Sequence, residues 1–140
     1  MDDIRVITPR YSPVAFPYTL DRHGGVVAGL ESDERVRRII GGLRSAGRTT
    51  FLPAETADME VDAAIYALHE REYIEFLRNQ SDAVQGGSVF MDNTRRAPGV
   101  RQDTPIVPNA YAFAREGVRT AISAAKAISS GALMSMFFTP

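Results

Sequence analysis

Few residues in this sequence could carry out chemistry by themselves. It has two histidines, His23 and His69, and no cysteine. A hydrolytic zinc site needs about three ligands and an open position, and no His-x-His or His-x-x-x-His spacing supplies them. Schiff-base chemistry has a single candidate, Lys126, and neither a phosphate-binding glycine loop after a strand nor a serine nucleophile elbow is found. We therefore expect no catalytic residue, metal ligand or cofactor site in the chain.

Composition is typical of one globular domain spanning residues 1–140. Hydrophobic residues make up 44% of the 140 residues and charged residues 24%. The net charge of −1 gives no long-range attraction to nucleic acid or to an anionic membrane. The acidic N-terminus does not have the pattern of a signal peptide, and no apolar run approaches the roughly 18 residues of a membrane span. These features predict a cytoplasmic protein without nucleic-acid or membrane partners.

Strand and helix patterns alternate along the chain, which favours a parallel α/β sheet. A β-branched run and a Thr-rich run, each ended by proline, predict two strands. Helical spacing of apolar residues predicts four helices. Long segments rich in Gly, Pro and Asn between them predict loops without regular structure. The expected strands are 4–7 and 49–52, the helices lie between Ser32 and Gly47, from Asp58 to Leu68, at 70–77 and at 112–130, and the loops are 8–31 and 79–109.

Capping residues and apolar stripes orient these helices. Asp58 and Asn109 are expected to cap the helices that follow them. In the helix of residues 70–77, Tyr73, Ile74 and Leu77 are expected to point inward. Arginines of the first helix are expected on its solvated face. The longest helix carries an apolar stripe of small and branched residues, Ala114, Val118, Ala121, Ile122, Ala125 and Ile128.

The last residues form an apolar run, 132–138, with no alternation. Such a run predicts a strand buried on both faces in the middle of a sheet. An exposed strand of this kind would pair with another chain. The sequence thus predicts a three-layer α/β fold with a short parallel sheet of about three strands, in the order 2-1-3, flanked by helices. We expect a second copy or a complementary C-terminal chain to complete it through residues 132–138.

Several blocks together resemble the histone deacetylase and acetylpolyamine amidohydrolase family, in its N-terminal third. Tyr11-Ser12-Pro13 follows the first strand, as a similar block does in the family. His69, Tyr73-Ile74 and Leu77 resemble its His-x-x-x-Tyr-hydrophobic-x-x-Leu block. Asp103-Thr104-Pro105 stands where the family has Asp-x-Pro, and Gly24-Gly25, Glu31 and Arg35 resemble the amidohydrolase branch.

The resemblance implies an arginase-like fold and zinc-dependent hydrolysis of acetylated amines. It places the family's zinc ligands and tandem histidines after residue 140, so the chain alone is expected to be inactive. It implies that Asp103 holds substrate groups at the mouth of the pocket, which Tyr11 and Phe16 in the first loop help to shape. Asp103 could equally form an Asx-type turn before Pro105. The resemblance also suggests a packing role for His69.

Two functional hypotheses remain open. The chain could be the N-terminal segment of a deacetylase-like enzyme that works with a separate chain carrying the histidines and the zinc. Alternatively, it could be a stand-alone homodimeric descendant that acts as a binding or scaffold module, or that uses a new pocket at the dimer interface. A degraded gene product without activity is a third alternative.

Overall fold

The computed structural model describes residues 4–10, 18–20, 25–28, 33–47, 49–85 and 106–131. Within them the chain forms four strands and four helices, in an α/β arrangement. The strands are β1 (Ile4–Thr8), β2 (Tyr18–Leu20), β3 (Val26–Ala28) and β4 (Thr49–Pro53). The helices are α1 (Asp33–Ser45), α2 (Asp58–Leu68), α3 (Arg71–Ala83) and α4 (Ala110–Ser129).

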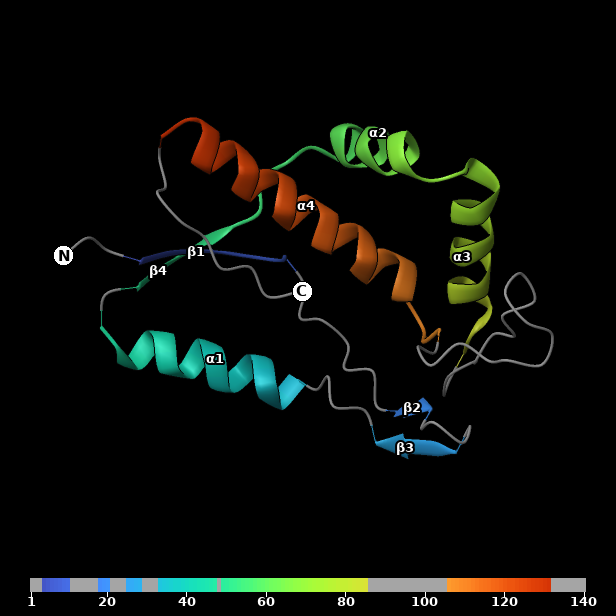
Figure 1. The fold of residues 1–140 in the computed structure, drawn as a ribbon, viewed down its shortest axis with the longest axis horizontal. Coiled ribbons are helices and arrows are strands. Elements are labelled where there is room, and N and C mark those ends of the chain that lie inside the picture. Colours follow the sequence, from blue (N-terminus) through green and yellow to red (C-terminus); the bar gives the residue numbers. More distant parts are fainter. Residues whose placement is uncertain are drawn as a thin grey trace.

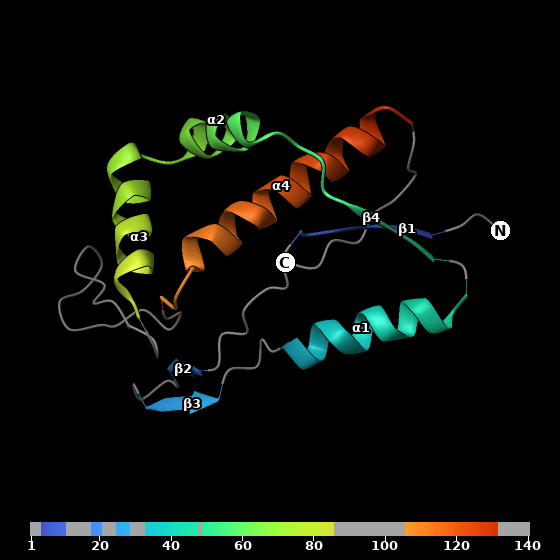
Figure 2. The same cartoon turned by 180° about the vertical axis from the view of Figure 1, so that it is seen from behind.

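Helices cover both sides of the β1–β4 pair. Figures 1 and 2 show α1 on one side of the two strands and α4 on the other. The helix α2 lies beside α4, and α3 crosses the end of α4 that begins at Ala110. The predicted α/β class and the helix–sheet–helix layering are therefore confirmed for this part of the chain. None of its helices is both long enough and apolar enough to span a membrane.

The sheet pairs β1 with β4 in parallel, from Ile4 opposite Thr49 to Thr8 opposite Pro53. This confirms the predicted neighbours. Val6 and Ile7 are consecutive and therefore point to opposite faces, yet both are buried, at 1% and 4% exposure. Two covered faces are characteristic of a strand in a parallel α/β sheet. The predicted third strand, 132–138, lies outside the described residues.

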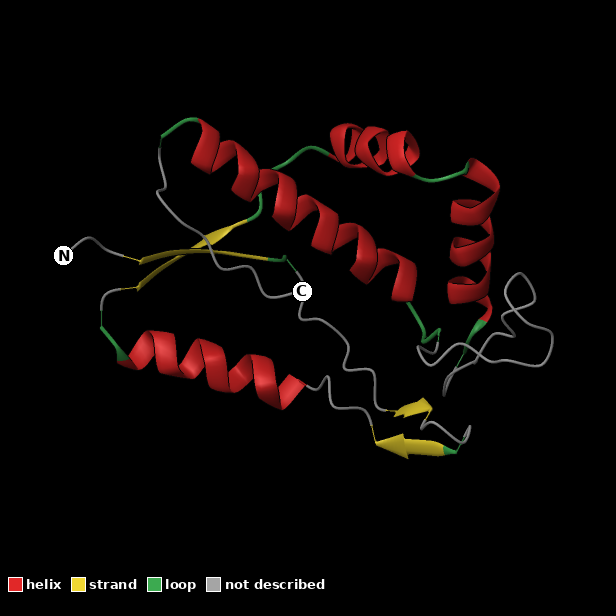
Figure 3. Cartoon of the chain, in the orientation of Figure 1, coloured by secondary structure: helices red, strands yellow, loops and turns green. Residues whose placement is uncertain are grey.

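The prediction that residues 8–31 lack regular structure is wrong. The short strands β2 and β3 pair antiparallel there, with Tyr18 opposite Ala28 and Leu20 opposite Val26 (Figure 3). Each strand has only three residues, which is too few to show an alternating pattern of apolar and polar residues. The prolines and glycines in this segment indicated a loop instead. A strand pair this short gains its hydrogen bonds from the partner strand, which the local pattern does not reveal.

A core cluster of apolar residues holds α2, α3 and α4 together. Its buried residues are Val61, Ile65 and Ile74. Helix α3 continues to Ala83, so the predicted start of a loop at residue 79 is wrong. Tyr73, predicted to point inward, is 45% exposed. The buried residues of α3 are Ile74 and Ser81, so Tyr73 lies off its buried face.

The start of α4 is capped differently from the prediction. Asn109 occupies the N-cap position, as expected, but its side chain makes no capping hydrogen bond. Its backbone is left-handed, with φ of 62°, a conformation that asparagine tolerates better than most residues. The buried hydroxyl of Ser81 in α3 accepts a hydrogen bond from the Tyr111 amide instead, at 3.1 Å. A residue distant in sequence thus satisfies the helix end.

The N-terminus of α2 also departs from the prediction. Ala57 is the N-cap, and Asp58 is the first helical residue. The carboxylate of Asp58 instead accepts hydrogen bonds from Arg115 and Arg119 of α4. An aspartate in the first turn still interacts favourably with the helix dipole.

The face that α4 buries is not the predicted apolar stripe. Ala114 and Ala125 are exposed, and Ile128 is 43% exposed. The buried residues of α4 are Glu116, Arg119, Thr120 and Ala124. Val118 and Ile122 of the stripe do pack, half-buried, against the cluster of Val61, Ile65 and Ile74. Hydrophobic periodicity missed this face because ion pairs compensate the burial of its charged residues.

Helix α1 largely follows its pattern. Its arginines, Arg35, Arg37, Arg38 and Arg44, are exposed as predicted. Its apolar face is half-buried at Val36, Ile40 and Leu43, whereas Ile39 is 43% exposed. Gly47, the predicted stop, has φ of +70°, and its amide donates to the Arg44 carbonyl at 3.1 Å.

We predict that Ile65→Ala lowers the free energy of unfolding by about 2–5 kcal/mol, because it leaves a cavity among α2, α3 and α4. Leu68→Ala on the same helix is the matched control. Leu68 is 82% exposed, so its truncation should change stability by about 0.5 kcal/mol or less. Urea unfolding of both variants measures the difference. Equal losses would show that α2 does not bury the face described.

Candidate functional site

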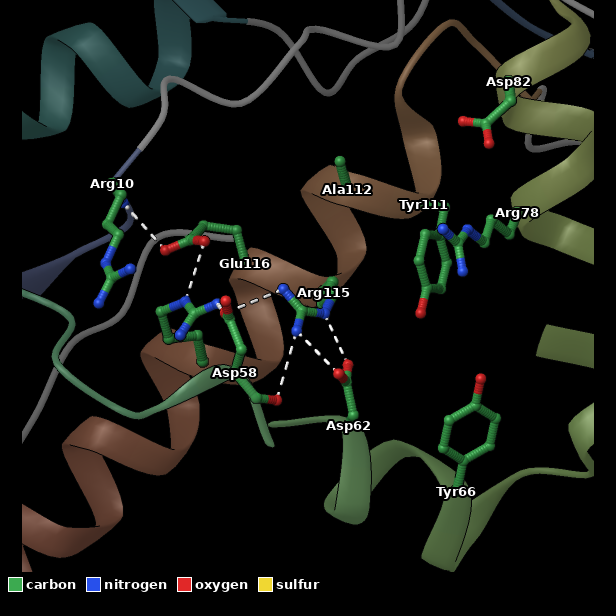
Figure 4. Close-up of a pocket in the computed structure, with 11 residues that line it drawn as sticks. Arg10, Asp58, Asp62, Tyr66, Arg78, Asp82, Tyr111, Ala112, Arg115 and Glu116 are labelled. Carbon is green, nitrogen blue, oxygen red and sulfur yellow. Dashed lines mark hydrogen bonds and ion pairs between the residues drawn. The ribbon is translucent and has the colours of Figure 1, made fainter. Parts of the chain in front are cut away.

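A charged cleft of about 500 Å³ lies between α2, α3 and the first half of α4. Figure 4 shows the side chains that line it. It opens beside the carboxyl ends of the parallel strands, since Arg10 follows the end of β1 and Asp58 follows β4. Ligands of open α/β sheets bind at this edge. The lining residues are Arg10, Asp58, Asp62, Tyr66, Arg78, Asp82, Tyr111, Ala112, Arg115, Glu116 and Arg119.

Arg115 joins α4 to α2 through a two-pronged ion pair. Its Nε donates to Oδ1 of Asp62 at 2.7 Å, and its Nη2 donates to Oδ2 at 3.0 Å. Its Nη1 donates to Oδ1 of Asp58 at 3.1 Å (Figure 4). The planar fork of arginine matches a carboxylate in this way, whereas a lysine would not. The pair thus fixes the rotation of α4 relative to α2.

Arg119, one turn after Arg115 on α4, forms a buried ion pair with Glu116. Their side chains are 3% and 7% exposed. The Arg119 Nε donates to Oε2 of Glu116 at 3.1 Å. The two Nη atoms of Arg119 donate to the Thr56 carbonyl and to the Asp58 carboxylate. Each charge therefore has a partner, as burial requires.

The second oxygen of Glu116 reaches the end of β1. It accepts a hydrogen bond from the Arg10 amide at 3.2 Å. The Arg10 Nε in turn donates to the Ala54 carbonyl, just after β4, at 3.1 Å. Through Arg10, one carboxylate of α4 is thus linked to the carboxyl ends of both parallel strands.

A hydroxyl cluster continues this connection along α4. Ser123 accepts hydrogen bonds from the amides of Glu55 and Thr56, at 3.0 and 3.1 Å. The hydroxyls of Ser123 and Thr56 lie 2.7 Å apart. These contacts satisfy the backbone between β4 and α2, where no ladder partner exists.

The ion pairs shift the pKa values of the cleft. The hydrogen bond from Arg115 lowers the pKa of Asp62 below its ordinary value. Hydrogen bonds from Arg119 and then Arg115 lower the pKa of Asp58. Burial lowers the pKa of Arg119, but its hydrogen bonds to Asp58 and Glu116 outweigh that effect, and the net shift is upward. All these groups are therefore charged at neutral pH.

The side of the cleft toward α3 is arranged differently. Tyr66, Arg78, Asp82 and Tyr111 line it (Figure 4), and none of their side chains has a hydrogen bond or ion pair in the described part of the chain. Burial, then the neighbouring Tyr66 and Asp62, raise the pKa of Tyr111. The Tyr111 hydroxyl therefore keeps its proton and can donate a hydrogen bond.

Three substrate-binding residues were predicted from the sequence. Tyr11, Phe16 and Asp103 all lie outside the described residues. His69, for which a packing role was predicted, is exposed. It follows the end of α2, and its ring contacts Tyr73 with 6.1 Å between centroids. As the C-cap of α2, His69 has extended backbone rather than helical backbone, and its side chain is not held on the buried face of that helix.

The residues of the cleft do not fit the zinc ion that the family resemblance implies. Within the described ranges, no group of three or more His, Asp or Glu side chains is arranged to hold a metal ion. Asp58, Asp62 and Glu116 already accept hydrogen bonds from arginines. The sequence does contain one Asp-x-His triplet, Asp21-Arg22-His23, but the family resemblance places the zinc ligands after residue 140. The triplet lies outside the described residues.

Comparisons with known proteins found no similar protein. Neither models of known protein families, nor curated proteins, nor solved structures gave a match to this chain. The resemblance to the deacetylase family therefore stays a prediction from the sequence.

Sequence reasoning missed the central residues of the cleft. Asp58 and Asp62 are four residues apart on α2, and Arg115 and Arg119 are four apart on α4. Residues at this spacing share a helix face. The available signal was an acidic face on α2 and a basic face on α4. It was overlooked because Asp58 was interpreted as a cap and α4 was interpreted through its apolar residues.

We predict that Arg119→Met lowers the free energy of unfolding by about 3–5 kcal/mol, because it leaves Glu116 buried without its partner. The double variant Glu116→Met/Arg119→Met should lose less than Arg119→Met alone, since no unpaired charge remains. Urea unfolding of the two variants measures the difference. An equal or larger loss in the double variant would show that the pair is not the source of the effect.

We predict that acid lowers the free energy of unfolding through protonation of Asp62. Its ordinary pKa is 3.8, and pairing lowers the pKa in the folded state. The pair therefore contributes stability above about pH 4 and loses it as the pH falls through the folded-state pKa. Asp62→Asn should reduce the dependence of the unfolding free energy on pH below about pH 4. Urea unfolding between neutral and acidic pH tests this, and parallel curves for both proteins would contradict it.

Proposed function

We propose that residues 1–140 form the N-terminal part of a deacetylase-like α/β fold. In this proposal they provide one side of a substrate site, and the zinc ligands and general base come from residues outside them. The observation that carries the proposal is the charged cleft at the carboxyl ends of β1 and β4. Enzymes with open α/β sheets bind their substrates at that edge.

The burial of the two strands supports the same proposal. Val6 and Ile7 in β1 are buried, whereas Leu52 in β4 is 37% exposed. This difference suits a sheet in which β1 is central and β4 lies at an edge, as in the expected order 2-1-3. A third strand beside β1 could come from residues 132–138, from a second copy or from a complementary chain.

We predict that residues 1–140 alone do not hydrolyse N-acetylputrescine in the presence of zinc. Turnover should appear when a C-terminal segment of an acetylpolyamine amidohydrolase, beginning at its Pro-Pro-Gly-His-His-Ala motif, is co-expressed with them. Because Asp103 is proposed to hold the substrate amine, Asp103→Asn should lower kcat/KM of the assembled enzyme by about 10–100-fold. Glu72→Gln, at an exposed site on α3, is the matched control.

Light scattering of the same samples separates the alternatives. A complex of the two segments that lacks zinc-dependent turnover would overturn the proposal. Chelator-sensitive turnover by residues 1–140 alone would also overturn it. A homodimer that excludes the added segment would favour the alternative of a stand-alone binding or scaffold module.

A further inference from the structure

The polar groups of the cleft divide into two sets. Toward α4 and β1, the carboxylates of Asp58, Asp62 and Glu116 hold Arg115 and Arg119 in ion pairs. Toward α3, Arg78 and Asp82 make no ion pair or hydrogen bond within the described ranges. The first set holds the fold together, whereas the second set is available to a ligand.

The available set contains one cation, one anion and two phenols. Arg78 and Asp82 are four residues apart on α3 and thus lie on one helix face. Figure 4 shows Arg78 beside the ring of Tyr111, with the hydroxyls of Tyr111 and Tyr66 directed into the same space. Asp62 and Arg115 line the same cleft beside the two phenols.

We propose that this side of the cleft binds a small zwitterion of the free amino acid type. Arg78 and the Tyr111 hydroxyl donate hydrogen bonds to its carboxylate, and Asp82 accepts from its ammonium group. The rings of Tyr66 and Tyr111 contact its side chain.

Charge balance decides between a zwitterion and a simple anion. Arg78 alone would favour a carboxylate or phosphate, but the Asp82 carboxylate on the same helix face would repel a multiply charged anion. A ligand that carries both charges pairs with each group. The cleft volume of about 500 Å³ lies within the range of small-molecule sites and exceeds what a single ion needs.

Two contacts orient this side of the cleft. The Arg71 guanidinium lies over the Tyr66 ring, 4.4 Å from its centroid. This cation–π contact restrains the ring. Ser81 of α3 accepts a hydrogen bond from the Tyr111 amide, which holds the backbone at the start of α4. The Tyr66 ring and the backbone of Tyr111 are therefore held before a ligand arrives.

The test is calorimetric titration of the full chain with L-phenylalanine, N-acetyl-L-phenylalanine and phenethylamine. The last two compounds lack the ammonium charge and the carboxylate, respectively. We expect L-phenylalanine to bind, and each analogue to bind at least about 10-fold more weakly, because each loses at least one charge-assisted hydrogen bond. If either analogue binds as tightly as L-phenylalanine, or if none binds at roughly 10 mM, the proposal is wrong.

Variants locate the site. Arg78→Gln and Asp82→Asn should each weaken L-phenylalanine binding about 10–100-fold, and Tyr111→Phe should weaken it while leaving the ring in place. Glu72→Gln, also exposed on α3 but outside the cleft, should leave the affinity unchanged. Because Arg78 and Asp82 are exposed, both variants should keep the wild-type melting temperature. Unchanged affinity in both variants would show that L-phenylalanine binds elsewhere and would contradict the proposal.

This inference does not depend on zinc or on a second chain, so its outcome is separate from that of the proposed function.

Discussion

The buried pair of Glu116 and Arg119 is the interaction on which the arrangement of the described elements depends. Its two side chains contact the end of β1, the segment between β4 and α2, and the first turn of α2. Removing charges from water is costly, so such a pair persists only where every polar atom has a partner. The geometry of Arg10, Thr56 and Asp58 meets that requirement. It thereby fixes how α4 lies on the sheet.

Apolar packing acts at two places beside this pair. Ile7, Ala54 and Ala124 bring α4 against the strands, while Val61, Ile65 and Ile74 bring α2 and α3 against α4. Neither cluster is large, and several large apolar side chains of the described elements are exposed. The hydrophobic clusters bring the elements together, and the ion pairs between them define their orientation.

The same charged groups explain how a cleft survives in the middle of this packing. Arg115 and Arg119 keep the carboxylates of α2 and α4 together, and the space next to them stays polar. Closing this space would bury charged side chains that have no partner in the described part of the chain, which is costly. Here Arg78 and Asp82, both exposed on α3, favour an open, hydrated space.

The sequence by itself determined the local elements. Pro9 directly follows β1, Pro53 is the last residue of β4, and glycines with positive φ follow the ends of α1 and α4. These outcomes follow from steric limits that act within a few residues. The alternation of elements also indicated the parallel pairing, since such strands need a crossover.

Only the tertiary structure decided which face of α4 is buried, how its first turn is capped, and where the cleft lies. Glu116 is buried because Arg119, the Arg10 amide and the strand ends meet it there, and no local pattern in α4 announces those partners. Ser81 caps α4 from a neighbouring helix. The burial of a charge depends on groups distant in sequence that compensate its lost hydration. Hydrophobic periodicity therefore located α4 but not its contacts.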